Sequence, residues 1–213
     1  MEKLTSAELD KDKSWVLLSL RQTSPADLLF AALICLLMLL ALVGARSAEA
    51  QSLAASKVTE QQVKAAYLSK FGSYVEWPAQ AFASPESPLR VGVISDDALA
   101  DDLAQILVGR TIGGRKVQVQ KLRPGDPVTG LNVLFIGRSG NKRLADILAT
   151  TKGTPILTVT ESAEGLALGS TINFVIIDGK VRFEVAPKTA DLGNLNISAR
   201  LLAAAHKVAP GPL

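Results

Sequence analysis

The side chains most used in covalent and metal chemistry are almost absent from this 213-residue chain, which has one cysteine and one histidine. Cys35 lies inside an uncharged apolar run, so the rest of the chain can form no disulfide, no thiolate zinc site and no thiol nucleophile. His206 stands near the C-terminus, and no Gly-x-Ser-x-Gly sequence supplies a serine nucleophile for it. A metal site would have a single imidazole donor. The sequence therefore predicts a protein that is not an enzyme and needs no metal or cofactor.

Two polar segments resemble known binding loops only superficially. The loop from Gly137 to Lys142 follows a predicted buried strand and opens a helix, where free backbone N–H groups bind anions. Its lysine is not followed by Ser or Thr, so we predict an ordinary strand-to-helix turn and not a Walker loop. Asp96 and Asp97 follow the first strand like the acidic pair of a receiver domain, but the phosphoacceptor Asp is missing after the central strand. Helix capping explains these two acids.

Six other residues are candidates for binding a ligand or a partner. Tyr and Trp are favoured at pockets and interfaces because they bury a large area and keep a polar atom, although packing in the core is the alternative for them here. Two arginines in one cleft would suit a carboxylate or a phosphate, but the sequence does not place them together. We expect His206 to be a partly exposed packing residue on a helix. The candidates are Tyr74, Glu76, Trp77, Asn173, Arg182 and Arg200.

Composition narrows the class of protein further. Hydrophobic residues make up 48% of the chain, which is too many for a disordered protein. Aromatic residues make up 5% and the formal net charge is only +3, so the basic surface with stacking aromatics expected of a nucleic-acid-binding protein is missing. We therefore exclude nucleic acid as a partner.

The N-terminal 50 residues predict export from the cytoplasm. Residues 28–45 carry no charge, and the small residues that end in Ala50 suit cleavage by signal peptidase after Ala50. The apolar run is also long enough to be retained as a membrane anchor. In both cases the basic residues that precede it keep that end in the cytoplasm, so the chain after Ala50 lies in the periplasm. We expect a signal peptide or anchor over 1–50 and one domain over 51–213.

The pattern of apolar residues after Ala50 predicts alternating helices and strands. A capping box at Thr59 and Gln62 begins a helix whose apolar face continues through Tyr74 and Val75 to Pro78. Asp178-Gly179 joins the last two predicted strands as a hairpin, with Val181, Phe183 and Val185 on one face of the second strand. A final helix carries Leu201, Leu202, Ala205 and Val208. We expect an α/β fold, a single domain with a mixed β-sheet of about six strands and helices on both faces. The strands are predicted over residues 89–94, 117–122, 133–136, 155–159, 171–177 and 180–185.

Several segments resemble, in order, those of the YfiR-like periplasmic proteins. They cover essentially the whole chain after Ala50, and none of them is catalytic. The segments are VKAAYLSKFGSYVEWP (63–78), PLRVGVISDDALADDL, GRTIGGRKVQVQKL, NVLFIG, GTPILTVTES, TINFVIIDGKVRFEV and LNISARLLAAAHKV.

The resemblance implies a periplasmic α/β domain without enzymatic activity. Such a protein binds the periplasmic part of an inner-membrane diguanylate cyclase and inhibits it, which lowers cyclic di-GMP and the output of biofilm and exopolysaccharide. The resemblance also implies an outer-membrane lipoprotein that can sequester the regulator, and we count a second copy of the chain among the candidate partners. Family members carry disulfide-forming cysteines, one of them just before the NVLFIG-type strand. Here that position is Leu131-Asn132, so control by disulfides should not be transferred to this chain.

We therefore expect a periplasmic negative regulator of a membrane-bound diguanylate cyclase. The alternative is a periplasmic small-molecule-binding sensor, or an accessory domain for transport or envelope assembly. A neighbouring gene for a membrane cyclase would favour the first, and one for a transporter or outer-membrane receptor the second.

Overall fold

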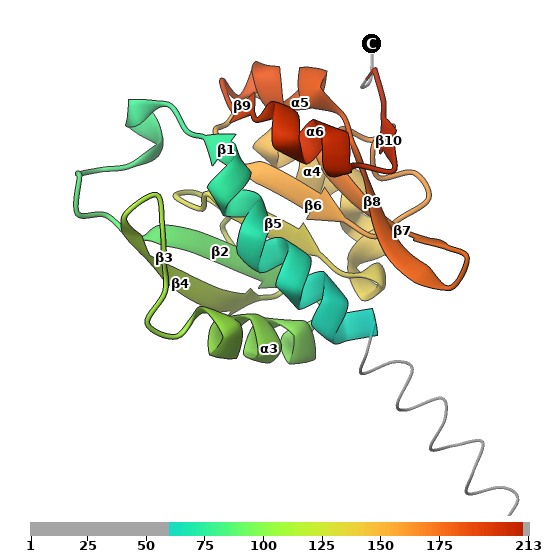
Figure 1. Ribbon diagram of the computed structural model, residues 1–213, viewed down its shortest axis with the longest axis horizontal. Coiled ribbons are helices and arrows are strands. Elements are labelled where there is room, and N and C mark those ends of the chain that lie inside the picture. The colour runs from blue at the N-terminus through green and yellow to red at the C-terminus, as the bar shows by residue number, and fades with distance from the viewer. Residues whose placement is uncertain (1–59, 211–213) are drawn as a thin grey trace, which may run out of the picture. The chain divides into compact units, whose positions relative to one another are not determined.

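The computed structural model describes residues 60–210, which form an α/β domain built on one large sheet (Figure 1). The predicted signal peptide or anchor and the predicted capping residue Thr59 lie outside the described residues. Within 60–210, no helix is both long and apolar enough to cross a membrane. The first described element is a helix over residues 60–71. The 3₁₀ turns are η1 (Gly72–Tyr74), η2 (Ala79–Ala81) and η3 (Arg138–Arg143), and the later helices are α3 (Asp97–Leu107), α4 (Leu144–Thr151), α5 (Pro187–Leu192) and α6 (Ala199–Ala204).

The large sheet has eight strands in the order β10-β8-β7-β6-β5-β2-β4-β3. Its five central strands, β4 to β7 in space, are parallel, whereas β3 and β8 run antiparallel to their neighbours β4 and β7. A separate antiparallel pair joins β1 to β9. The strands are β1 (Val75–Glu76), β2 (Leu89–Ile94), β3 (Thr111–Ile112), β4 (Arg115–Leu122), β5 (Val133–Ile136), β6 (Leu157–Thr160), β7 (Ile172–Ile177), β8 (Lys180–Val185), β9 (Asn196–Ile197) and β10 (Lys207–Val208).

The order of the parallel strands creates a position where a ligand site is expected. Counted in chain order, β2, β4, β5, β6 and β7 lie in the spatial order 2-1-3-4-5, as in flavodoxin-type doubly wound sheets. The chain leaves β2 toward β4 on one side, while β5 lies on the other side. The carboxyl ends of β2 and β5 therefore flank the switch point, where such sheets bind their ligands.

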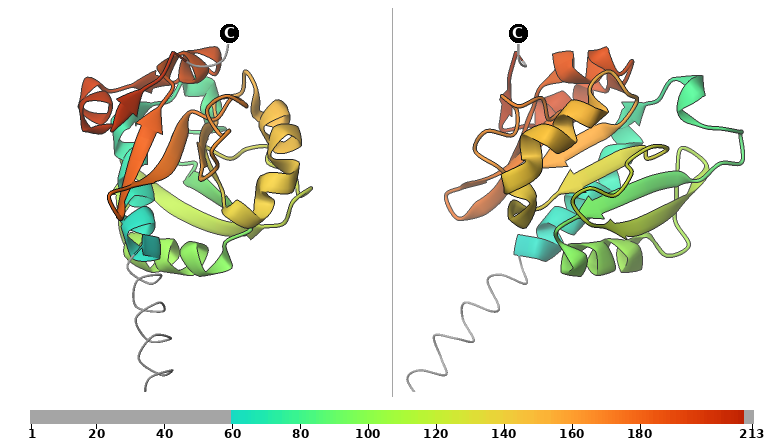
Figure 2. Two further views of the ribbon diagram at one scale, coloured as in Figure 1. Left: turned by 90° about the vertical axis from the view of Figure 1, so that its right-hand side faces the viewer. Right: turned by 180° about the vertical axis from the view of Figure 1, so that it is seen from behind.

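Helices cover both faces of the sheet, as predicted. The helix over residues 60–71 and α3 pack on one face, and α4 packs on the other (Figure 2, left). The first face holds an aromatic cluster in which the ring of Phe183 lies 5.1 Å from that of Phe71 and 5.4 Å from that of Tyr67. Leu144, Ile147 and Leu148 of α4 pack against the second face. Two apolar cores therefore hold the strand ends in place.

The predicted hairpin is confirmed in its turn and in its register. Asp178 has φ 49° and Gly179 has φ 68°, which is the pair of positive φ values that a type I′ turn requires. Phe174 pairs with Phe183 across the two strands. Val181, Phe183 and Val185 are buried, as the alternation predicted, while Arg182 is exposed.

The predicted number of strands was too low. All six predicted strands are present, but β1, β3, β9 and β10 are two-residue strands that are too short to show an alternating pattern. The first helix gives way to η1 after Phe71, and Val75, predicted to lie on its apolar face, belongs to β1. The last helix ends at Ala204, and Val208 lies in β10. His206 is exposed and lies beyond α6, where its backbone N–H donates to the carbonyl oxygen of Phe183.

Candidate functional site

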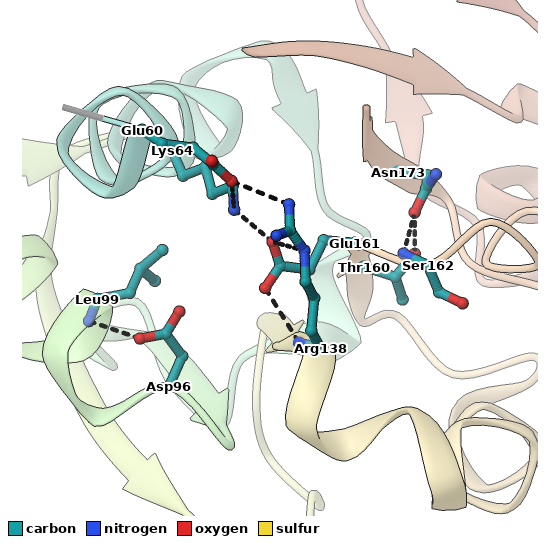
Figure 3. A network of polar contacts seen from close by, with 9 residues as sticks. All are labelled: Glu60, Lys64, Asp96, Leu99, Arg138, Thr160, Glu161, Ser162 and Asn173. Atoms are coloured by element: carbon teal, nitrogen blue, oxygen red, sulfur yellow. Dashed lines mark hydrogen bonds and ion pairs between the residues drawn. The ribbon is translucent and has the colours of Figure 1, made fainter. Parts of the chain in front are cut away.

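Three parallel strands and the first helix bring charged side chains together at the switch point (Figure 3). Arg138 follows β5 and Glu161 follows β6, while Glu60 and Lys64 lie one turn apart on the helix over residues 60–71. These four residues, called here the ion network, line a cavity of about 370 Å³ together with Ser95 and Asp96, which follow β2. The cavity lies at the position that the strand order predicts for a ligand site.

The ion network is tightly connected. Lys64 Nζ donates to Glu60 Oε1 at 2.6 Å and to Glu161 Oε2. Arg138 donates from Nη2 to Glu60 Oε1 at 2.9 Å, and its Nε lies 3.4 Å from Glu161 Oε2. The side chains of Lys64 and Glu161 are 7% and 6% exposed, so this pair is largely shielded from water.

The charges of the network balance, since two carboxylates face one ammonium and one guanidinium. The hydrogen bond from Lys64, with the positive charges of Lys64 and Arg138, lowers the pKa of Glu60 although partial burial acts against this. A buried pair of this kind contributes little net stability but costs much when one partner is removed. The network therefore fixes the first helix to the carboxyl ends of β5 and β6.

The loop from Gly137 to Lys142 supplies a backbone donor to the network and so binds an internal anion. The N–H of Arg138 donates to Glu161 Oε1 at 3.0 Å, at the place where an external anion would bind. Gly137 allows this approach, because a Cβ there would lie only 3.0 Å from the carbonyl oxygen of Ser95. The prediction that Asp96 or Asp97 caps a helix is confirmed for Asp96, whose Oδ1 accepts the N–H of Leu99 at 3.0 Å.

Asn173, one of the candidate binding residues, lies beside the network but is engaged within the fold. It is 3% exposed, and its Oδ1 accepts hydrogen bonds from Thr160 Oγ1 at 2.8 Å and from the N–H of Ser162 at 3.0 Å. These bonds attach the segment over residues 161–170, which connects β6 to β7 without a helix. The structure thus gives Asn173 a positioning role for this segment.

Tyr74, Glu76 and Trp77 lie next to the C-terminal part of the domain. Glu76 Oε2 accepts the side-chain amide of Asn196 at 3.0 Å, and the carbonyl oxygen of Tyr74 accepts the N–H of Ser198 at 2.9 Å. Trp77 is half-buried with its ring 6.4 Å from that of Phe82, and among the described residues its Nε1–H has no hydrogen-bond partner. The pairing of β1 with β9 thus joins two segments that are about 120 residues apart in sequence.

The two candidate arginines lie in different surroundings. Arg200 is exposed on α6, two residues after Ser198, and so belongs to the β1–β9 region. Arg182 is exposed on β8 and lines a cavity of about 650 Å³ with Glu60 and Tyr67, and Arg200 is not part of that lining. Arg200 therefore lies two residues from Ser198, whose N–H bonds to Tyr74, whereas Arg182 lies in the lining of a different cavity.

The sequence reasoning missed the ion network, although a signal for it was present. Arg138 and Glu161 each lie two residues after a predicted buried strand, and the carboxyl ends of neighbouring parallel strands meet at one edge of a sheet. Glu60 and Lys64 have the spacing of four that favours an ion pair on a helix. Among residues 60–210 no group of three or more metal-ligating side chains comes together.

A known protein family matches most of the described domain. A search of curated proteins returned no match. The model of the YfiR/HmsC-like family matches residues 61–206, which includes all but the first residue of the first helix, every strand of the large sheet except β10, and the β1–β9 pair. This match spans more than half of the chain. The chain therefore belongs to the YfiR/HmsC-like family.

Proposed function

We propose that this protein is a periplasmic regulator without catalytic activity, which binds the extracytoplasmic domain of an inner-membrane diguanylate cyclase and inhibits the enzyme. The observation that carries the proposal is the family match over residues 61–206, because YfiR-like proteins are periplasmic regulators of such cyclases. The lone histidine supports a non-catalytic role, since it is exposed and lies outside the ion network. The export signal predicted before residue 51 supplies the periplasmic location.

The β1–β9 region is the surface that we assign to the cyclase. We define the regulatory surface as Tyr74, Glu76, Trp77, Asn196 and Arg200. It joins the first and the last of the segments that resemble the family, which meet where β1 pairs with β9. It combines a half-buried aromatic pair with one exposed acid and one exposed base, which is a mixture typical of protein–protein contact sites. Its two charged side chains, Glu76 and Arg200, are exposed and lie outside the ion network, so we expect the fold to tolerate changes of their charge.

Inhibition would follow from unequal affinity for two states of the cyclase. A regulator that binds the inactive state more tightly shifts the population toward that state, and the ratio of the two affinities limits the inhibition. Release of the regulator, for example by a sequestering lipoprotein of the outer membrane, would then raise cyclic di-GMP. A consequence is that variants of the regulatory surface should lose inhibition and binding together.

Charge reversal on the regulatory surface tests this assignment. Arg200→Glu and Glu76→Lys should each reduce co-purification of the regulator with the full-length cyclase from membranes by about tenfold, because each places a like charge against the partner. Both variants should keep the thermal unfolding midpoint of the parent, since both side chains are exposed. Arg123→Glu, an exposed reversal after β4, is the matched control and should bind normally. Normal binding by both surface variants would show that the cyclase contacts another part of the protein.

A further inference from the structure

A further cavity lies beside α4. The helix α4 packs on the face of the sheet opposite to the first helix (Figure 2, left). It encloses about 350 Å³ between α4, the segment over residues 161–170 and α5. Leu148 and Ile156 contribute apolar side chains that are 2% and 6% exposed, and Leu168 and Leu192 are exposed apolar residues of its lining. This volume falls within the range of small-molecule sites.

The cavity exists because no helix covers this part of the sheet. The segment over residues 161–170 takes the place of a crossover helix between β6 and β7, and Thr158 and Thr171 belong to the lining of the cavity. Both threonines are buried and bonded to each other, with Thr158 Oγ1 accepting the N–H of Thr171 at 2.9 Å and donating to Thr171 Oγ1 at 3.3 Å. This arrangement leaves the hydroxyl proton of Thr171 without an acceptor among the described residues.

Two further polar groups of the lining also offer protons, whereas the hydroxyls of Thr151 and Thr154 already donate to backbone carbonyl oxygens. Thr189 Oγ1 is shielded from solvent and has no hydrogen-bond partner within residues 60–210, which is costly for a polar atom unless something else binds it. Lys152, at the end of α4, adds an exposed ammonium group. None of the residues that line the cavity is acidic. The cavity therefore presents two hydroxyl donors and one cation above an apolar base, with no matching anion.

We propose that this cavity binds a small carboxylate with an aliphatic body of about eight carbons, a size suited to its volume. The carboxylate accepts from Thr189 and Thr171 and lies near Lys152, while the aliphatic part contacts Leu148 and Ile156. This site is separate from the ion network and from the regulatory surface, and it does not depend on the function proposed above.

Isothermal titration calorimetry with octanoate tests the proposal. The protein is purified from cells that express the full-length gene. Octanoate should bind saturably at one site, and octanol about tenfold more weakly because it lacks the negative charge that Lys152 and the two hydroxyls favour. Octylammonium should not bind. The proposal is overturned if octanoate does not bind to the folded protein, or if octanol or octylammonium binds equally well.

Three variants locate the site. Thr189→Val keeps the side-chain shape and should weaken octanoate binding about threefold to tenfold without lowering the unfolding midpoint, because the hydroxyl has no partner to lose in the free protein. Ala149→Trp, at an exposed position of α4 in the lining, should abolish binding by filling the cavity, whereas Ala203→Trp on the exposed face of α6 should not change it. Unchanged affinity in both Thr189→Val and Ala149→Trp would show that octanoate binds elsewhere and would overturn the assignment.

Discussion

At the scale of single residues, Lys64 is the centre of the ion network. It is the buried cation that both carboxylates share, since Glu60 and Glu161 each accept a hydrogen bond from its Nζ. Arg138 also contacts both carboxylates, but its side chain is far more exposed. Loss of Lys64 would leave the buried Glu161 carboxylate with only the partly exposed Arg138 as a counter-charge.

Lys64→Met should therefore lower the free energy of unfolding by about 3 kcal/mol, because it leaves a buried carboxylate undercompensated. Urea denaturation at neutral pH measures this loss. Lys70→Met is the matched control on the same helix, where the lysine is exposed, and should change stability by less than about 0.5 kcal/mol. Equal stability of the two variants would mean that the network does not hold the helix to the sheet.

The pH dependence of stability should show the contribution of Glu60. Its pKa is lowered in the folded protein by Lys64 and Arg138, so the folded state binds its proton less readily than the unfolded chain does. The stabilising contribution is complete above the unfolded pKa of about 4.5 and is lost as the pH falls through the lower folded value. Urea denaturation between pH 7 and pH 3 should show this loss, and Glu60→Gln should flatten the curve. A Glu60→Gln protein with the same pH profile as the parent would contradict this role.

At the scale of elements, the β7–β8 hairpin is held by its aromatic contacts with the first helix. Phe183 is 3% exposed and packs against Tyr67 and Phe71. Phe183→Ala should lower the free energy of unfolding by about 3–5 kcal/mol, since it leaves a cavity in the core. Arg182→Ala, one residue away on the exposed face, should be nearly neutral. Chemical denaturation measures the stability of both variants. A loss of unfolding free energy in Phe183→Ala no larger than that in Arg182→Ala would refute this packing.

Elements with strong local signals could be predicted from the sequence, and those that depend on tertiary contacts could not. The hairpin turn needs positive φ values that Asp178-Gly179 supplies locally, and the cap of α3 needs only the Asp96 side chain. By contrast, β1 and β9 are two residues each and exist because distant segments meet. Asn173 is predicted as a binding residue because it is a polar residue in an apolar strand. Its hydrogen bonds with Thr160 and Ser162 depend on the pairing of β6 with β7, which the local sequence does not reveal.

At the scale of the whole molecule, strand order accounts for the location of the candidate site. The alternation of helices and strands predicted a mixed sheet, but only the order 2-1-3-4-5 places Arg138 and Glu161 at the switch point with Glu60 and Lys64 above them. That crevice is lined by the protein's own ion network. The regulatory surface lies at the β1–β9 pair, so the fold separates the part that maintains its structure from the part that we assign to a partner.

The level of cyclic di-GMP in cells that lack this protein tests the proposed inhibition most directly. If the protein restrains a membrane diguanylate cyclase, deletion of its gene should raise cyclic di-GMP and matrix production, and additional deletion of the cyclase gene should cancel the rise. The rise should be reversed by the parent protein and by Arg123→Glu, but not by Arg200→Glu. Unchanged cyclic di-GMP in the single deletion, in cells that express the cyclase, would contradict the account.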